Sequence, residues 1–419
     1  YLDSPDRIKD PIPQGLNWSS LDVVRYDNNA ERLVGGTFSK IFLNGQGNNH
    51  FTTGNIECSE LRTVNEDLEI MPGDYIITNE LKLEGTSASA GQLFIFADNT
   101  GYGQLFTPLL TSNKVNPKVT KEFYIDANPS ERWVDMSTAL TGANLSNLAE
   151  PGASIVFDVE GIGSAFEWDA SIANWVQSSA SGNDPTHGNR IYLGTRGAGG
   201  SDIFLRDGSG TVSENTTDFQ TASTSRAMYY NDGQNTTATF VGGTGITETE
   251  GWNFIANPFL ANYDWDAAFP SLDAEIRKVY YVWNGTNYVN RNAAGVGAAG
   301  QYIAPGQGFW IQVDATWTSG DPFPLDIANI DPTGSGSFLK TNGTEDFVSI
   351  QVSELDGPYK DEVFMQFSTI LSDEFEGGYD AVNLMNAPMV PNLSILGAQG
   401  HFSTFATSDK NKTYTLNFS

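Results

Sequence analysis

Short apolar segments with a two-residue period constrain the fold of this chain more than any other feature. Leu81 and Leu83 alternate with charged residues, and Leu68 and Ile70 flank Glu69. Successive side chains of a strand point to opposite faces of the sheet, so this period is typical of half-buried strands. No helical period appears in the segments between Thr37 and Phe96. The pattern therefore predicts an all-β protein.

The alternation is clearest in a first region, residues 1–117, after an opening of proline-containing coil. Small or polar residues separate its apolar segments, and the segments do not share a fixed length. This succession is compatible with a short β-solenoid or a β-meander, and we expect a short β-solenoid-like region. The expected strands are Thr37–Leu43, Asn55–Val64, Asp67–Ile70, Asp74–Leu83 and Gln92–Phe96.

Two further regions, residues 118–335 and 336–419, are predicted to be β-sandwiches, jelly-roll-like in form. In the first of them, Val279–Trp283 leads into Asn284-Gly285, and an apolar segment returns. Asn-Gly between apolar runs is a strong hairpin signal, because a type I′ turn needs positive φ at both central residues. In the last region Val348–Ser353 alternates as a half-buried strand. The chain stops at Ser419, so we expect this sandwich to lack its final strands.

The charge balance limits the classes of partner. Lys and Arg number 22 against 51 Asp and Glu, which gives a formal net charge of -29. Such a surface repels phosphate backbones and anionic lipids, so we expect no nucleic-acid partner. No apolar run approaches the roughly 18 residues of a membrane span, so no membrane insertion is expected. The charge suits a salty exterior and divalent cations, although solubility alone also explains it.

Few residues of the chain suggest catalysis. The single cysteine, Cys58, excludes an internal disulfide framework and is expected to fill a strand position as a small apolar residue. The three histidines are far apart in sequence, without the spacing of a zinc site. The chain contains no Gly-x-Ser-x-Gly nucleophile motif. We therefore expect neither an enzyme nor a required cofactor.

A glycine-rich segment, Gly295–Gly300, matches the spacing of a dinucleotide-binding loop. That loop requires a strand before it and a helix after it. Here Asn290–Asn292 precedes the segment, and Pro305 falls where the helix would have to begin its first turns. We interpret the segment as a surface loop that binds no nucleotide.

Calcium is the cation most compatible with the acidic segments. Carboxylates and glycines concentrate between residues 361 and 380, and oxygen ligands at this density suit a hard cation. A solvated acidic loop explains the same composition. The predicted ligands, if a cation binds, are Asp361, Asp373, Glu376 and Asp380.

Glycoside hydrolysis needs two carboxylates that the fold brings together in space. Two segments are candidates for such a pair, because they place carboxylates beside an indole ring, as sugar sites often do. They are Glu167–Asp169, around Trp168, and Asp264–Asp266, around Trp265. The alternative interpretation makes Trp168 and Trp265 core residues with solvated neighbours. If the chain binds carbohydrate, the aromatic residues expected to stack on it are Trp168, Trp175 and Trp317.

One series of motifs is more specific than any catalytic pattern, and its order resembles a domain found in large surface proteins of Bacteroidota that are exported by the type IX secretion system. The motifs contain a Trp-Asn-Phe strand with Asn-Pro after it, a Tyr-Val-Trp-Asn-Gly hairpin and a Pro-Gly-Gln-Gly-Phe strand entry. The resemblance covers about Val119 to Leu384. Its segments are Glu131–Val134, Gly251–Phe259, Tyr263–Asp266, Tyr281–Gly285, Tyr302–Ile311 and Asp373–Ala381.

These motifs are scaffold features, with Trp252, Phe254, Phe309 and Ile311 expected to face inward, and they bring no active site with them. The resemblance implies an extracellular location on a Gram-negative cell and a non-enzymatic role as an adhesin or structural component. It also implies partners among cell-surface or secretion-system proteins, or glycans. This sequence departs from the family in showing no C-terminal sorting domain, which we expect either beyond Ser419 in the full protein or removed at the cell surface. An alternative function is a carbohydrate-binding accessory region of a secreted glycoside hydrolase.

Overall fold

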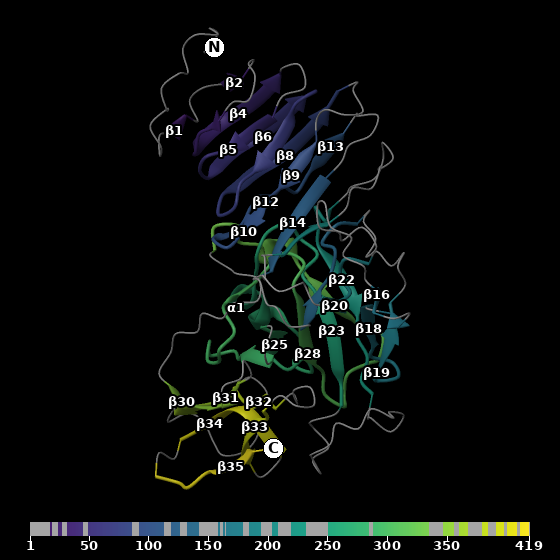
Figure 1. The fold of residues 1–419 in the computed structure, drawn as a ribbon, viewed down its shortest axis with the longest axis vertical. Coiled ribbons are helices and arrows are strands. Elements are labelled where there is room, and N and C mark those ends of the chain that lie inside the picture. Colours follow the sequence, from purple (N-terminus) through teal and green to yellow (C-terminus); the bar gives the residue numbers. More distant parts are fainter. Residues whose placement is uncertain are drawn as a thin grey trace.

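The computed structural model confirms an all-β chain, whose strands form three groups that follow one another along the long axis (Figure 1). It describes residues 17–18, 24–26, 32–44, 49–85, 92–112, 119–125, 132–141, 158–159, 162–163, 165–178, 184–193, 203–207, 219–231, 250–284, 288–334, 347–355, 360–367, 379–383, 391–397, 400–408 and 411–418.

Two sheets form the first group. All pairs of the first sheet are parallel, in the order β1-β4-β6-β8-β12, with β2 on β4 and β13 on β8. Its strands are β1 (Asn17–Trp18), β2 (Val24–Tyr26), β4 (Gly36–Asn44), β6 (Ile56–Val64), β8 (Tyr75–Glu84), β12 (Gln104–Phe106) and β13 (Leu110–Ser112).

The second sheet runs β3-β5-β7-β9-β14-β21 and is parallel except for its last pair. The chain alternates between the two sheets as it advances. The strands are β3 (Arg32–Leu33), β5 (Asn49–Thr52), β7 (Asp67–Ile70), β9 (Leu93–Ile95), β14 (Val119–Ile125) and β21 (Ile203–Asp207), and β10 (Ala97–Asp98) pairs with β11 (Gly101–Tyr102) nearby.

Side chains of equal type stack between these sheets at a fixed interval. Ile41, Leu61 and Leu81 lie in register at steps of 20 residues, and each is at most 1% exposed. Parallel pairing at constant register places one apolar side chain above the next, which makes a continuous core. This 20-residue step is not evident in the sequence, because the later steps are longer: Leu110 pairs with Leu81.

The outer face of the first sheet carries a ladder of ion pairs. Lys40 Nζ lies 3.0 Å from one Glu60 oxygen, and Lys82 Nζ lies 2.9 Å from the other and 3.0 Å from Glu80. Each exposed pair contributes little, roughly 0–1 kcal/mol. Lys40 lies directly opposite Glu60, whereas Glu60 lies opposite Glu80, and Lys82 bridges these two carboxylates from the next outward position of β8.

The sequence predicted a boundary between two regions near residue 118. Strands from both sides of this position belong to one sheet. Val119 of β14 pairs with Leu93 of β9, so the strand expected to open the second region extends the second sheet. Buried residues further along the chain, such as Val134 and Ile191, join the same core. The first and second regions are therefore continuous in structure.

A central four-stranded antiparallel sheet, in the order β23-β28-β25-β26, organises the second group. Both of its faces are buried. Trp252, Phe254 and Trp310 lie on one face, and Ile255 and Phe309 lie on the other. The strands are β23 (Trp252–Ala256), β25 (Tyr280–Trp283), β26 (Tyr288–Arg291) and β28 (Gly308–Gln312).

The expected inward positions are confirmed as buried, but they do not share one face. Trp252 and Phe254 point to the opposite side from Phe309 and Ile311. The intervening residues are buried too, so the half-buried pattern expected of these strands is wrong here. A sheet covered on both faces buries every position along its strands.

A second antiparallel sheet, β15-β20-β18-β19, covers the Trp252 face and forms a sandwich with the central sheet. Aromatic rings fill the space between them. Trp310 stacks on Phe254 at 4.5 Å between ring centroids and meets the Trp168 ring edge at 5.4 Å. The covering strands are β15 (Arg132–Met136), β18 (Ala165–Asp169), β19 (Asn174–Gln177) and β20 (Asn189–Leu193).

Short elements cover the other face, where Tyr263, Trp265 and Phe323 are fully buried. Asp264 caps the short helix α1, since its carboxylate accepts a bond from the Ala267 amide. The elements are β22 (Thr224–Ala227), β24 (Tyr263–Asp264), α1 (Trp265–Ala268), η2 (Phe269–Ser271), β27 (Tyr302–Ile303), β29 (Pro322–Leu325) and η3 (Ile327–Asn329). A separate pair consists of β16 (Asp158–Val159) and β17 (Ile162–Gly163).

The predicted hairpin is confirmed, with a longer connection than a two-residue turn. Trp283 pairs with Tyr288, so four positions separate the strands, of which 285–287 lie outside the described residues. The return strand accordingly begins later than the sequence suggested.

The glycine segment 295–300 is a turn before β27, and no helix follows it within residues 288–334 until the short η3. The expectation of a surface loop is wrong, because Val296 and Ala299 are at most 1% exposed. Gly297 has a φ of 127°, and a Cβ there would lie 2.0 Å from the Asn290 carbonyl oxygen. Close packing against β26 explains this glycine.

The third group is one mixed sheet in the order β30-β31-β34-β33-β35, with β32 on β34. Its described apolar cluster includes Val363, Ile395 and Phe405, while Leu416 and Phe418 on the edge strand are 41% and 62% exposed. The strands are β30 (Phe347–Ser353), β31 (Lys360–Phe367), β32 (Ala381–Val382), β33 (Leu393–Gly397), β34 (Gly400–Thr407) and β35 (Thr415–Phe418).

Truncating the middle of the stacked core tests the register. We expect Leu61→Ala to lower the free energy of unfolding of the first group by about 2–5 kcal/mol, because the cavity has stacked side chains above and below it. Ser59→Ala, at an exposed position of the same strand, should change it by less than about 0.5 kcal/mol. Urea denaturation followed by hydrogen exchange measures both, and equal losses would contradict the stacking.

Candidate functional site

A cleft of about 310 Å³ lies where β18, the turn before β20, and β22 meet, and we call it the Glu167 cleft. Trp168 points into the aromatic layer and donates its Nε1–H to the Trp252 carbonyl at 2.8 Å. Because side chains alternate along a strand, Glu167 and Asp169 on either side of it line the cleft. The lining residues used below are Glu167, Asp169, His187, Arg226, Tyr229 and Asn253.

Arg226 and His187 form a connected polar network at this cleft. Arg226 Nη1 donates to Asp184 at 2.5 Å, and its Nη2 lies 3.0 Å from His187 Nδ1. The other ring nitrogen of His187 lies 3.3 Å from the Trp168 carbonyl oxygen. The contacts with Arg226 and with the Trp168 carbonyl fit a neutral imidazole that donates from Nε2 and accepts at Nδ1. The same Nδ1 lies 3.3 Å from a Glu167 carboxylate oxygen, so Glu167 belongs to this network.

The pKa shifts follow from burial and from this network. Burial, and then the Arg226 charge, lower the pKa of His187 to about 4, so the ring is neutral at pH 7. Burial raises the pKa of Glu167, while Arg226 acts in the opposite direction. For Asp184 burial alone would raise the pKa, but bonds from Thr186 and the Arg226 charge bring it below its ordinary value.

Backbone turns and amides hold the walls of the cleft. The Asp169 carboxylate accepts bonds from the Ser171 amide and hydroxyl, at 3.0 and 2.6 Å. Asn253 is 3% exposed and bonds both the amide and the carbonyl of Tyr229. These bonds fix the cleft before any ligand arrives.

A buried ion pair lies near the cleft on the same covering sheet. Arg190 donates two bonds to Asp135, at 2.8 and 2.9 Å, and Asp135 is 1% exposed. The guanidinium also lies 5.0 Å from the Trp175 ring and bonds the Tyr288 hydroxyl. Burial raises the pKa of Asp135, and the Arg190 charge opposes that rise. The pair orders the aromatic layer from the side of the covering sheet.

The aromatic residues expected to stack on sugars are mostly in the core. Trp168 is 4% exposed and Trp317 is 8% exposed, with its Nε1–H donating to the Met228 carbonyl. Trp175 is partly exposed, and Arg190 covers its ring. The interpretation of Trp168 and Trp265 as core residues is confirmed, since Trp265 is fully buried.

The predicted calcium ligands are only partly described. Asp361 is buried and accepts bonds from the amides of Glu362 and Leu393. Asp380 is also buried and accepts a bond from the Ala406 amide at 2.7 Å. Asp373 and Glu376 lie outside the described residues. Within the part of the chain that the structure describes, no group of three potential metal ligands comes together, and calcium binding stays a prediction.

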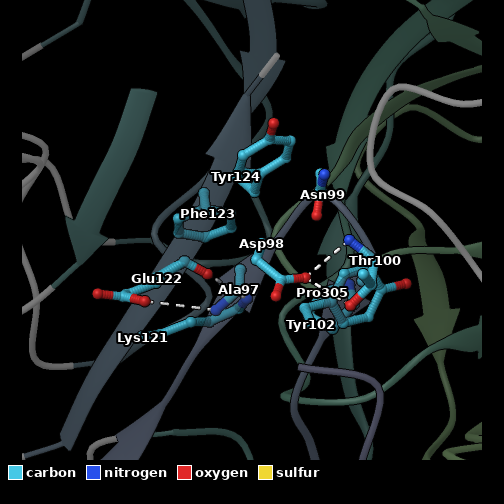
Figure 2. A pocket seen from close by; sticks show the side chains of 11 residues that line it. Ala97, Asp98, Asn99, Thr100, Tyr102, Lys121, Glu122, Phe123, Tyr124 and Pro305 are labelled. Carbon is cyan, nitrogen blue, oxygen red and sulfur yellow. Dashed lines mark hydrogen bonds between the residues drawn. The ribbon is translucent and has the colours of Figure 1, made fainter. Parts of the chain in front are cut away.

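A smaller cavity of about 40 Å³ lies beside β10, β11 and β14, against Pro305 of the central group (Figure 2). Lys121 is 2% exposed there, with its Nζ 4.1 Å from the Phe123 ring centroid and 5.7 Å from that of Tyr102. The aromatic faces favour the cation. The space admits a few water molecules at most, and it lies at the joint between the first and central groups.

Cys58 is buried in β6 as expected, and burial raises the pKa of its thiol to about 11. The thiol is therefore protonated at neutral pH and unsuited to nucleophilic attack. No described helix is long and apolar enough to cross a lipid bilayer.

Sequence reasoning selected Glu167–Asp169 through the carboxylates beside an indole, but it missed His187, Arg226 and Asn253. His187 lies in the turn before β20, Arg226 on β22 and Asn253 on β23, so only the fold brings them to Glu167. Comparison with protein-family models, with curated proteins and with solved structures finds no match.

The buried pair gives a stability prediction. We expect Asp135→Asn to lower the free energy of unfolding by about 3–5 kcal/mol, because it leaves the Arg190 charge, whose side chain is only 20% exposed, without its carboxylate. The matched control Asp184→Asn removes the carboxylate that pairs with Arg226. The Asp184 side chain is 49% exposed, so this change should lower the free energy of unfolding by about 1 kcal/mol or less. Denaturant titration of both variants measures this, and a loss for Asp135→Asn no larger than the control's would contradict it.

His187 gives a pH dependence. The ordinary pKa is 6.5 and the folded value about 4, so in that window only the unfolded chain binds the proton. Stability should therefore fall as pH drops from 6.5 to 4, by at most about 3 kcal/mol from this residue. His187→Gln keeps a donor and an acceptor without titrating, and should flatten part of the slope in thermal melts. Burial also lowers the pKa of His50 to about 4, and His50 keeps its own contribution to the pH dependence in the His187→Gln variant.

Proposed function

We propose that this protein is a non-enzymatic extracellular surface protein, which works as a stiff rod for adhesion or for the structure of a cell-surface assembly. In this proposal the two parallel sheets form a short β-solenoid, and jelly-roll-like sandwiches follow it. The observation that carries the proposal is the hydrogen bonding between consecutive groups of strands, which supports a fixed end-to-end arrangement.

Buried asparagines make these joints. At the first joint, the Asn262 amide donates to the Gln104 side chain at 2.9 Å, and Tyr102 donates its hydroxyl proton to the Asn262 side chain. At the second, Asn290 donates to Ser403 at 2.9 Å and accepts from Thr404 at 2.8 Å. Buried bonds of this kind are costly to break, because each leaves a polar group without water. Consecutive groups therefore resist bending.

The charge and composition fit the same role. A formal net charge of -29 discourages nonspecific contact with anionic surfaces, and one buried free cysteine needs no reducing environment. We propose cell-surface or secretion-system proteins, or glycans, as partners, and no nucleic acid. The motif resemblance to exported surface proteins points in the same direction.

Intact cells that produce the protein test this proposal. We expect the chain in the surface or extracellular fraction, and we expect external protease to cleave it while a cytosolic marker survives. Its end-to-end arrangement predicts a small-angle scattering profile of an elongated particle for the purified chain. A protein that stays in the cytosol and resists external protease would overturn the proposal.

A further inference from the structure

We infer that the Glu167 cleft binds a neutral saccharide, an inference that rests on the proposed surface-binding function and names its ligand class. The cleft lies on the sandwich, away from the joints that hold the three groups together. Its volume of about 310 Å³ is at the lower end of the range for small-molecule sites, roughly 300–1,000 Å³. It therefore has space for a small ligand or for one end of a longer one.

The lining carries both signs of charge within one small space. Glu167 and Asp169 supply carboxylates, and Arg226 supplies a guanidinium. Arg226 repels a cationic ligand, and the two carboxylates repel an anionic ligand. An uncharged polyhydroxy ligand avoids both repulsions, because each hydroxyl can donate to a carboxylate and accept from a guanidinium.

Arg226 is held in place for this role by Asp184, which is not among the lining residues, and by His187, which shares the lining. Its two terminal nitrogens contact Asp184 and His187, and Asp184 is itself fixed by bonds from the Thr186 amide and hydroxyl at 3.0 and 2.6 Å. The imidazole stays neutral above about pH 5, so it adds no second positive charge. A ligand thus meets a preformed arrangement and orders few side chains on binding.

Tyr229 supplies the apolar surface that a sugar ring requires. Its backbone is pinned by Asn253, and its partly buried ring lies beside Phe254 and Ala227 in the lining. A tyrosine ring offers an apolar face with a hydroxyl at its edge. Trp168, the residue first expected to stack, instead supports the cleft from the core.

Three variants separate this inference from a structural role of the same residues. Glu167→Gln removes a carboxylate whose side chain is 37% exposed, so it should fold. Ala227→Leu narrows the cleft from an exposed position without touching the polar network. Asp273→Asn removes an exposed carboxylate elsewhere in the same group of strands and is the matched control.

The probes are an array of neutral, anionic and amine-bearing glycans, followed by calorimetric titration of the best neutral glycan into the purified chain. We expect neutral glycans to bind, and Glu167→Gln to weaken binding about tenfold, as loss of a charge-assisted bond predicts. Ala227→Leu should weaken it at least as much, and Asp273→Asn should not change it. Melting temperatures of all variants should match the parent chain.

Salt distinguishes the ligand classes. Affinity for a neutral glycan should stay within about twofold between roughly 0.05 and 0.5 M NaCl, because no net charge pair forms. The inference is overturned if only anionic or amine-bearing glycans bind, if affinity falls steeply with salt, or if Glu167→Gln and Ala227→Leu bind like the parent chain. Absence of binding to every neutral glycan also overturns it. Surface exposure on intact cells is measured without any glycan, so failure here leaves the proposed function standing.

Discussion

Burial of both faces of the central sheet forces the polar groups at its strand ends to find partners inside the protein, since water cannot reach them. Asparagine side chains meet that demand, because one amide can donate and accept at once. Asn257, fully buried, accepts from the Phe259 amide and donates to the Ala261 and Ile303 carbonyls. It thereby closes the turn that follows β23.

The same kind of residue connects the central sheet to its neighbours. Asn262 faces the first group, Asn290 and Asn292 face the third, and Asn253 fixes the wall of the Glu167 cleft. Each makes bonds that only one relative placement satisfies. The stiffness of the rod and the preformed shape of the cleft therefore have one origin, the amide bonding around a sheet with no solvated face.

The alternation of apolar residues was enough to predict β4, β6, β7, β8 and β9 of the first group, and Asp67–Ile70 matches the observed bounds. Shorter strands of the same sheets, such as β5 and β12, were not predicted, because a few residues show no clear alternation. Both-face burial was not predictable from Trp252 and Phe254, because an alternating pattern does not say what covers the other face. Buried asparagines were missed for a related reason: asparagine is typical of turns, and only neighbours distant in sequence make it a core residue. At the cleft, one strand carries a recognisable pattern, while Arg226 and His187 reach Glu167 only through the fold.

Lysine and arginine residues are scarce in this chain, so only a minority of the carboxylates can form ion pairs. The chain has 22 Lys and Arg residues, and several neutralise specific carboxylates at defined places: Arg190 at Asp135, Arg291 at Asp266 and Lys82 at Glu60. The remaining carboxylates leave a strongly negative protein. This negative charge attracts few macromolecules over long distances, because most of them are also negatively charged. Recognition therefore has to come from short-range hydrogen bonds in a rigid site. A rigid cleft that holds two carboxylates and one guanidinium, inside a chain with a large negative net charge, satisfies that requirement.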